Sequence, residues 1–300
     1  MEEDNLTGIH ERLIDIEALF ASKNPNLLRF IPRFVLSYLK RITHQEEVNR
    51  YIWRNRDKSG LAFVEAILNE FGVKVEVLNP VNVNRSGTDT FWTASVLIPS
   101  SGRFIVASNH PLGGIDGMAM MHAFGKSRTD IVFPVNDLLM NVPGLRPLFI
   151  PINKHGRNTE NARLIDETFS SDKIILYFPA GLCSRKQWIN GKMEIHDLEW
   201  KNTFIKKARK YQRDIIPVYI DGRNSDWFYN LARWRKRLGI GANIEMLYLV
   251  DEMTKQFGKT ITLKIGDIIP WTTFDKSKTE AQWAGWVQEK VYNLEKQVNE

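Results

Sequence analysis

A histidine and an aspartate stand six positions apart in SNHPLGGIDG, the segment that occupies residues 108–117. The apolar run RFIVA precedes it, so both side chains are predicted to lie where a strand ends and a helix begins. A carboxylate bonded to one imidazole nitrogen fixes the tautomer and leaves the other nitrogen free to accept a proton from a hydroxyl. His110 and Asp116 therefore predict a general base, although a structural turn with Asp116 as a helix cap is the alternative.

Other chemistry has weaker support in the sequence. No Gly-x-Ser-x-Gly motif follows a predicted strand, which argues against a serine hydrolase. The single cysteine, Cys183, is more typical of a small residue that fills space in a turn than of a nucleophile. The histidines His110, His122, His155 and His196 lack a ligand spacing such as His-Glu-x-x-His, so we expect no metal and no prosthetic group.

Strands and helices are predicted to alternate over most of the chain. Runs rich in Val, Ile and aromatic residues predict strands at 73–78, 103–108, 130–135, 173–178, 214–220, 244–250 and 260–265. Helical patterns occur at about 117–125, 159–170, 199–211 and 224–237. This alternation predicts an α/β fold, a largely parallel sheet flanked by helices. Ligands of such folds bind at the carboxyl ends of the strands, where residues 108–117 would lie.

Helical patterns dominate the N-terminal part, at 8–21, 27–42 and about 44–71. We therefore predict a helical N-terminal extension over residues 1–72 and an α/β domain over 73–300, which a helix at 276–298 closes. The segment LLRFIPRFVLSYLKRI at 27–42 fits a helix packed on the core. It also fits a helix on a bilayer surface, since basic residues stand beside large apolar ones.

The composition of the 300 residues, 43% hydrophobic and 25% charged, is that of an ordinary soluble protein. The acidic N-terminus does not resemble a signal peptide, and no run of 18 apolar residues predicts a transmembrane helix. A single cysteine fits a reducing compartment. These features predict a protein of the cytoplasmic side.

The net charge of +6 is unevenly placed. Residues 201–237 hold eleven lysines and arginines against three aspartates, a local charge of +8. Such a face attracts phosphates of nucleic acid, anionic lipid or a phosphorylated cofactor. The segment YNLARWRKRLGIG at 229–241 fits a helix with a solvated face or a helix docked on anionic lipid. No nucleic-acid-binding motif accompanies the charge, so we expect no nucleic-acid partner.

Four blocks of sequence, in order, resemble the motifs of the glycerolipid (PlsC-like) acyltransferase superfamily. They are NHPLGGID (109–116), PGLRPLFIPINKHGR (143–157), YFPAGLCSR (177–185) and DIIPVYI (214–220), and the resemblance covers about residues 100–220. Five residues separate His110 from Asp116, where most of the superfamily has four. This longer form resembles a bacterial hemolysin-like subgroup, related to enzymes that O-acylate lyso-ornithine or lyso-glycine lipids.

The resemblance implies a reaction and a set of site residues. His110, oriented by Asp116, would deprotonate an acceptor hydroxyl, which then attacks the thioester of acyl-CoA or acyl-carrier protein. Basic residues of the second and third blocks, Lys154 or Arg157 and then Arg185, would bind a phosphate of the acceptor or the donor. The other substrate-binding residues implied are Asn109, Gly113, Gly114, Phe178, Pro179, Ala180, Gly181 and Ser184.

The third block departs from the family's motif at two places. Ala180 stands where the motif has a glutamate, and Leu182 and Cys183 replace Thr-Arg, so that the basic role passes to Arg185 and Lys186. The lost glutamate, together with the longer loop between His110 and Asp116, favours a lyso amino-acid lipid over a lysophosphatidate-type glycerolipid. The expected partners are thus a lysolipid, an acyl thioester and a membrane surface, with peripheral attachment to the cytoplasmic face of a bacterial inner membrane. A lipid hydrolase or thioesterase, and a basic anion- or nucleic-acid-binding protein, stay open as alternatives.

Overall fold

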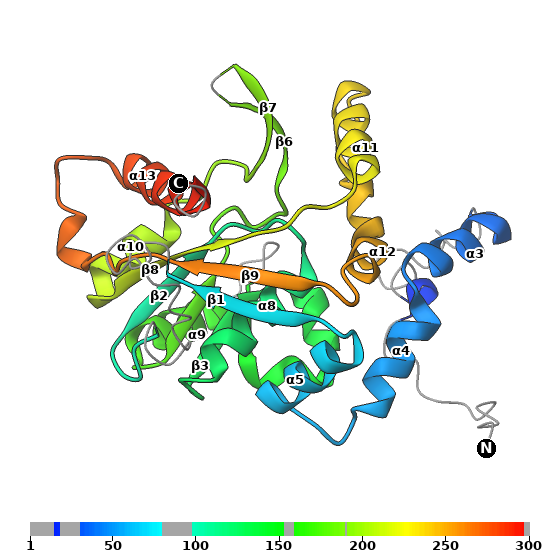
Figure 1. The fold of residues 1–300 in the computed structure, drawn as a ribbon, viewed down its shortest axis with the longest axis horizontal. Coiled ribbons are helices and arrows are strands. Elements are labelled where there is room, and N and C mark those ends of the chain that lie inside the picture. The colour runs from blue at the N-terminus through cyan, green and yellow to red at the C-terminus, as the bar shows by residue number, and fades with distance from the viewer. Residues whose placement is uncertain (1–14, 19–30, 80–97, 153–158, 190, 297–300) are drawn as a thin grey trace, which may run out of the picture.

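The computed structural model describes residues 15–18, 31–79, 98–152, 159–189 and 191–296. A seven-stranded sheet has the order β1-β9-β8-β2-β5-β3-β4 (Figure 1). Its strands are β1 (Lys74–Leu78), β9 (Thr260–Ile265), β8 (Asp214–Ile220), β2 (Phe104–Ser108), β5 (Ile174–Tyr177), β3 (Ile131–Val135) and β4 (Phe149–Pro151). A separate hairpin joins β6 (Arg185–Ile189) to β7 (Lys192–His196).

Five neighbouring strands of the sheet, β8, β2, β5, β3 and β4, run parallel. Strand β9 is antiparallel to β8, and β1 is parallel to β9. The predicted α/β fold with a largely parallel sheet is confirmed. In the register of β2 with β8, Ser108 lies opposite Val218, so the carboxyl ends of these two strands meet at one edge. Residues 108–117 follow at that edge.

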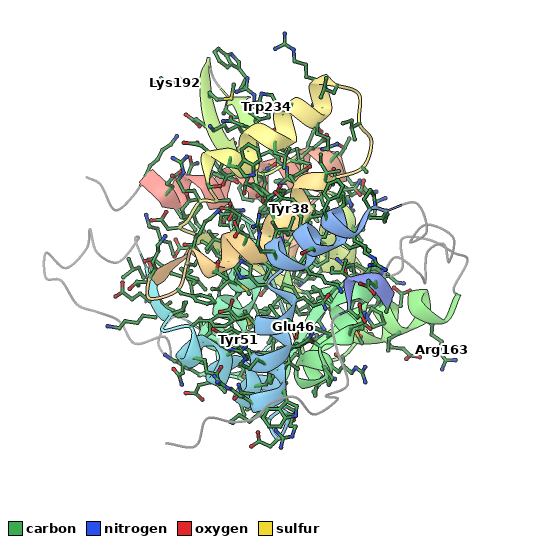
Figure 2. The ribbon with its side chains drawn as sticks, turned by 90° about the vertical axis from the view of Figure 1, so that its right-hand side faces the viewer. Tyr38, Glu46, Tyr51, Arg163, Lys192 and Trp234 are labelled. Atoms are coloured by element: carbon green, nitrogen blue, oxygen red, sulfur yellow. The ribbon has the colours of Figure 1, made fainter. Side chains whose placement is uncertain are left out.

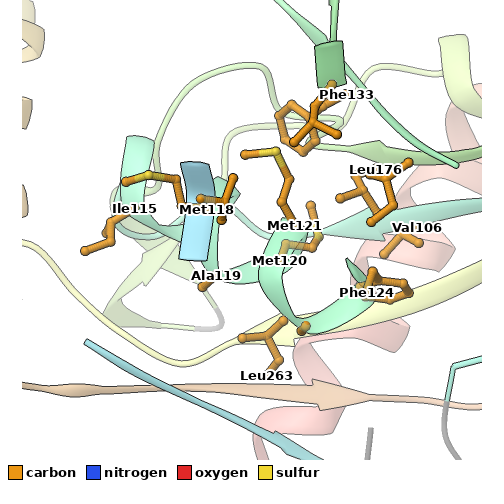
Figure 3. Close-up of a cluster of buried hydrophobic side chains, with 14 of the residues drawn as sticks. Val106, Ile115, Met118, Ala119, Met120, Met121, Phe124, Phe133, Leu176 and Leu263 are labelled. Atoms are coloured by element: carbon orange, nitrogen blue, oxygen red, sulfur yellow. The ribbon is translucent and has the colours of Figure 1, made fainter. Parts of the chain in front are cut away.

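Helices cover both faces of the sheet. Successive side chains of a strand point to opposite faces, and all five residues of β2 are buried, so each face needs a covering layer. Val106 of β2 packs in a core with α5 (Gly60–Glu70) and α8 (Gly114–Gly125). Figure 3 shows this core around the methionines of α8. Ile105 and Ala107 belong to the core on the other face, with α10 (Thr203–Tyr211) and α13 (Glu280–Lys296). Helix α9 (Thr159–Ser170) supplies Phe169 to the second core.

The N-terminal part is helical, as predicted, but the segment 44–71 forms two helices. They are α4 (Gln45–Arg54) and α5, with α3 (Arg33–Ile42) before them. Gly60, where α5 begins, has a φ of +59°, which interrupts a continuous helix. Phe63 and Val64 of α5 lie in the main core. The division at residue 72 stays a prediction, and most of the predicted helix 8–21 lies outside the described residues.

One predicted strand is wrong. Residues 244–250 form a 3₁₀ helix, η3 (Ile244–Tyr248), which leads into α12 (Leu249–Thr254). A short apolar run cannot distinguish a buried strand from a buried helical segment by periodicity alone. Here the buried side chain of Glu245 is paired with two arginines, which holds the segment against α11 (Asp226–Arg237).

Three further 3₁₀ segments complete the described chain: η1 (Asp137–Asn141), η2 (Pro143–Leu148) and η4 (Trp271–Thr273). Strand β4 and the hairpin were not predicted. Among the described residues, none of the helices has both the length and the apolar character needed to cross a membrane.

Candidate active site

The loop between β2 and α8 brings His110 and Asp116 together. Nδ1 of His110 lies 3.0 Å from Oδ2 of Asp116. The turn depends on Gly113, whose φ of +92° is unfavourable for other residues. A Cβ at this position would also lie 3.0 Å from a methyl of Leu249 and 3.4 Å from the sulfur of Cys183. The short loop is therefore shaped by a glycine and by two segments distant in sequence.

The carboxylate of Asp116 is fully buried and held by the start of α8. Its Oδ2 accepts hydrogen bonds from the backbone N–H of Leu112 at 2.9 Å and of Gly113 at 3.2 Å, and its Oδ1 accepts one from Gly117 at 2.9 Å. A carboxylate is stabilised at a helix N-terminus by these donors and by the helix dipole. Asp116 thus has both of the predicted roles. The hydrogen bonds by which it caps α8 also fix its carboxylate against the ring of His110.

The imidazole of His110 is partly accessible, with 17% of its side chain exposed. Its ring stacks on Phe178 of the third block, with centroids 4.0 Å apart and an angle of 17° between the planes. Burial lowers the pKa of His110, but Asp116 and then Cys183 outweigh it, and the pKa lies well above its usual value of 6.5. The imidazolium form is stabilised here, which suits a group that accepts a proton during a reaction.

A buried carboxylate that the sequence did not indicate, Asp197, clamps the first and third blocks together. Its Oδ1 accepts hydrogen bonds from the backbone N–H of His110 at 3.1 Å and from the hydroxyl of Ser184 at 2.6 Å. Its Oδ2 accepts one from the indole of Trp200 at 2.9 Å. The backbone N–H of Ser184 in turn donates to the carbonyl of His110 at 2.8 Å. His110 is thus held at its backbone as well as at its ring.

Asn109, a predicted substrate-binding residue, has structural contacts in this arrangement. Its amide nitrogen donates to the carbonyl of Ile220 at 2.9 Å, and its carbonyl oxygen accepts from the backbone N–H of Ile220 at 2.7 Å. Because the side chain is buried and paired in both directions, it joins the end of β2 to the end of β8. The contact places the first block beside the fourth.

The third block lies against the histidine ring, on which its Phe178 stacks. Ala180 is buried in the apolar core that contains Trp200, so a methyl group occupies the position of the family's glutamate. Gly181 has a φ of +66° and lies near the ammonium group of Lys201, which a Cβ would approach to 3.4 Å. Pro179 is buried, whereas a Cβ on Gly114 would meet nothing within 4 Å. Gly114 is therefore the glycine of this site with open space beside it.

The cation of the third block, Arg185, is bound inside the protein. Its Nη2 lies 3.0 Å from Oε1 of Glu245, and its Nη1 donates to the carbonyls of Cys183 at 2.7 Å and Ser184 at 3.1 Å. The other oxygen of Glu245 pairs with Arg235 of α11 at 2.8 Å. All of these groups are largely buried, so the contacts favour a structural role for Arg185 over the predicted binding of phosphate.

The remaining predicted cations lie elsewhere. Lys186 is paired with Asp226 of α11 at 2.7 Å. Lys154 and Arg157 fall within residues 153–158, outside the described residues. Phosphate recognition by the second block therefore stays a prediction.

Replacement of Glu245 by alanine is expected to destabilise the protein by about 3–5 kcal/mol, because the change leaves two guanidinium groups buried without their carboxylate. Urea unfolding followed by tryptophan fluorescence measures the effect. The control is Glu167→Ala, which removes an exposed ion pair with Arg163 and should change the midpoint little. A Glu245→Ala protein as stable as the control would show that the buried pairs are energetically neutral.

A histidine oriented by a buried aspartate at the carboxyl end of a parallel strand is an arrangement that can take a proton from a hydroxyl group. A sequence model of the family described as "Acyltransferase" matches residues 18–300, nearly the whole chain. The chain belongs to this acyltransferase family. It is an acyltransferase, as the sequence indicated.

Two curated relatives are 47% identical to this chain over 284 residues. Both are named lyso-glycine lipid O-acyltransferase, one from Bacteroides thetaiotaomicron and one from Phocaeicola vulgatus. The alignments cover 94% of this chain and 97% and 95% of the two relatives. Among solved structures, the 1-acyl-sn-glycerophosphate (LPA) acyltransferase PlsC from Thermotoga maritima aligns at 18% identity with a TM-score of 0.44, over 78% of this chain and 80% of that one.

Proposed function

We propose that this acyltransferase moves a fatty acyl group from acyl-CoA or acyl-carrier protein to the hydroxyl of a lyso-glycine lipid. The observation that carries the proposal is the pairing of His110 with the buried Asp116 in a chain whose relatives of that name match it over almost their whole length. The apolar environment of Ala180 agrees with an acceptor other than lysophosphatidate. The reaction needs no metal and no prosthetic group.

The proposed step begins when His110 takes the proton of the acceptor hydroxyl. The oxygen attacks the thioester carbonyl, the new carbon–oxygen ester bond forms, and the carbon–sulfur bond breaks. The imidazolium then returns its proton to the departing thiolate, so the histidine ends the cycle as it began. Asp116 stabilises the imidazolium between these two transfers, because its carboxylate lies 3.0 Å from Nδ1.

We also propose peripheral attachment to the cytoplasmic face of a bacterial inner membrane. The acceptor named for the relatives is a lipid, and the chain carries excess positive charge in residues 201–237. The proposed donors, acyl-CoA and acyl-carrier protein, are carriers of the cytoplasm, so the enzyme would meet them on the cytoplasmic side of that membrane. Nucleic acid is not part of this proposal, because no nucleic-acid-binding motif accompanies the basic residues.

Comparison of the lipids of cells that produce the wild type, His110→Ala or no enzyme tests the proposal, in a host supplied with lyso-glycine lipid. We expect the diacylated lipid to appear, and its monoacyl precursor to fall, with the wild type alone. Immunoblotting controls for equal amounts of the protein. Release of free fatty acid without an acylated lipid would support a hydrolase instead, and identical lipids in all three cultures would exclude the transfer.

Cys183→Ala is expected to change the pH dependence of transfer more than its maximal rate. Because Cys183 raises the pKa of His110, its removal should leave the imidazole neutral at lower pH. The acidic limb of kcat/KM then moves to lower pH, while the plateau stays within about tenfold of the wild type. A loss as large as that of His110→Ala would instead indicate a covalent thioester on Cys183.

Asp197→Ala is expected to lower kcat/KM by on the order of 10²-fold, because the backbone of His110 loses the acceptor that fixes its position. Asp197→Asn keeps an oxygen for His110 and Ser184 and should recover part of kcat. Steady-state kinetics on folded variants, checked by circular dichroism, measures both. Wild-type kcat/KM in a folded Asp197→Ala protein would show that the clamp does not position the base.

A further inference from the structure

Helix α11 presents large apolar side chains to solvent. Trp227 is 47% exposed, Trp234 is 53% exposed, and Leu238, just past the helix, is 74% exposed. The two indoles lie two helical turns apart and touch edge to face, with centroids at 6.0 Å. The opposite face buries Phe228 and Tyr229. About half of each indole is exposed, and exposed apolar patches of this kind mark sites of interaction.

Cations surround these tryptophans. Between residues 226 and 237 there are four arginines and lysines against one aspartate, a net charge of +3. Arg233, Lys236 and Arg237 are exposed, whereas Arg235 is engaged with Glu245. The one aspartate, Asp226, is neutralised by Lys186 and Arg223. The free charge of α11 is therefore positive, and its cations stand beside the tryptophans in sequence.

The hairpin extends the same surface. Trp188, which is 69% exposed, lies opposite Met193 in the register of β6 with β7, so both side chains share one face of the hairpin. Lys186, two residues before Trp188 on the same face, contacts Asp226 of α11 at 2.7 Å. Figure 1 shows the hairpin and α11 extending from the sheet in the same direction, and in Figure 2 Lys192 and Trp234 lie at the same end of the molecule.

This surface adjoins the active site. Trp227 contacts Tyr248 with ring centroids 6.2 Å apart. Tyr248 and Leu249 pack against the buried cluster of Cys183, Phe228 and Tyr229. Leu249 reaches Gly113 of the histidine loop, where a Cβ would meet its methyl at 3.0 Å. A partner bound to α11 and the hairpin would thus lie next to the segments that form one wall of the His110 site.

We propose that the surface made of Trp188, Met193, Trp227, Trp234 and Leu238 with Arg233, Lys236 and Arg237, the α11–hairpin surface, docks on an anionic phospholipid bilayer. Tryptophan favours the boundary between headgroups and acyl chains, and lysine and arginine extend their charges to the lipid phosphates. Docking brings the His110 site to the level at which a lysolipid hydroxyl lies. Only this last step, the approach of the His110 site to a lysolipid hydroxyl, rests on the proposed function.

The test is flotation of the purified full chain with vesicles of phosphatidylcholine, with and without phosphatidylglycerol. Replacement of Arg233, Lys236 and Arg237 by glutamine should weaken partition into the anionic vesicles by about 100-fold. Trp227→Ala with Trp234→Ala should weaken it by at least about tenfold. The matched control replaces Lys126, Lys173 and Lys276 by glutamine. These exposed lysines lie near the amino ends of the parallel strands, and their loss should change partition little. Higher salt should weaken binding of the wild type.

Three outcomes would overturn the docking surface. They are equal weakening by the control, wild-type binding in both surface variants, and loss with the charge variant while the tryptophan variant binds normally, which indicates a general affinity for polyanions. Acyl transfer to lyso-glycine lipid in neutral detergent micelles keeps the two proposals distinguishable. Surface variants that fail to bind vesicles should keep this activity, whereas a wild type that binds vesicles and transfers no acyl group would contradict the proposed function alone.

Discussion

His110→Ala is expected to lower kcat/KM for acyl transfer by about 10²–10⁴-fold, since the acceptor hydroxyl loses the group that takes its proton. The effect should fall mainly on kcat, because the imidazole acts during the reaction and the contacts of Asp116 with the backbone of Leu112, Gly113 and Gly117 remain. Initial rates of thiol release, together with the acylated lipid product, measure the loss.

The control for this variant is His122→Ala, a half-buried histidine later in α8 that makes no contact with Asp116 in the structure. It should keep activity close to the wild type. If His110→Ala retained comparable activity while folded, His110 would not be the base, and the proposed mechanism would be wrong.

Asp116→Asn is expected to lower the rate by on the order of 10²–10⁴-fold through the orientation of His110. The carboxylate accepts three backbone hydrogen bonds and also faces Nδ1 of the histidine. An amide has one accepting oxygen, so its NH₂ group must face one of these donors. The resulting rearrangement favours the wrong tautomer of the ring and loosens the start of α8.

Asp116→Asn should also shift the pH profile of kcat/KM to lower pH. In the wild type the pKa of His110 is raised, so the base is protonated at low pH and kcat/KM increases as the pH rises through that pKa. Without the negative charge the pKa falls, and the acidic limb should move to lower pH. A profile of kcat/KM between about pH 5 and 10 measures it. An unchanged acidic limb would show that the group that titrates is not paired with Asp116.

The strands of the parallel sheet and the histidine loop could be predicted because their signals are local. Runs of β-branched residues mark β2 and β8, and the six-residue spacing of His110 and Asp116 lies within one turn. The segment that contains Glu245 was predicted as a strand and is a 3₁₀ helix, since its apolar residues suit a strand as well as a buried helical segment. Its structure is decided by arginines 60 and 10 residues away in sequence.

Asp197 could not be assigned to the site because its contacts form only after folding. It follows the hairpin of β6 and β7, which begins at Arg185, the last residue of the third block, and that hairpin was not predicted. A signal was present: Asn-Gly at residues 190–191 separates RKQWI from KMEIH, and this dipeptide favours tight hairpin turns. With the hairpin recognised, a buried aspartate at its end becomes a candidate for contact with the third block, though its bond to His110 depends on long-range packing.

The most direct test of the account is a balance of products with purified enzyme, lyso-glycine lipid and a palmitoyl thioester of CoA or of acyl-carrier protein. Thiol release and both possible lipid products are quantified in the same reaction. The account predicts one molecule of acylated glycine lipid for each thiol released, with at least one of the donors and at a higher kcat/KM than with lysophosphatidate. One molecule of free fatty acid for each thiol, without acylated lipid, would contradict it.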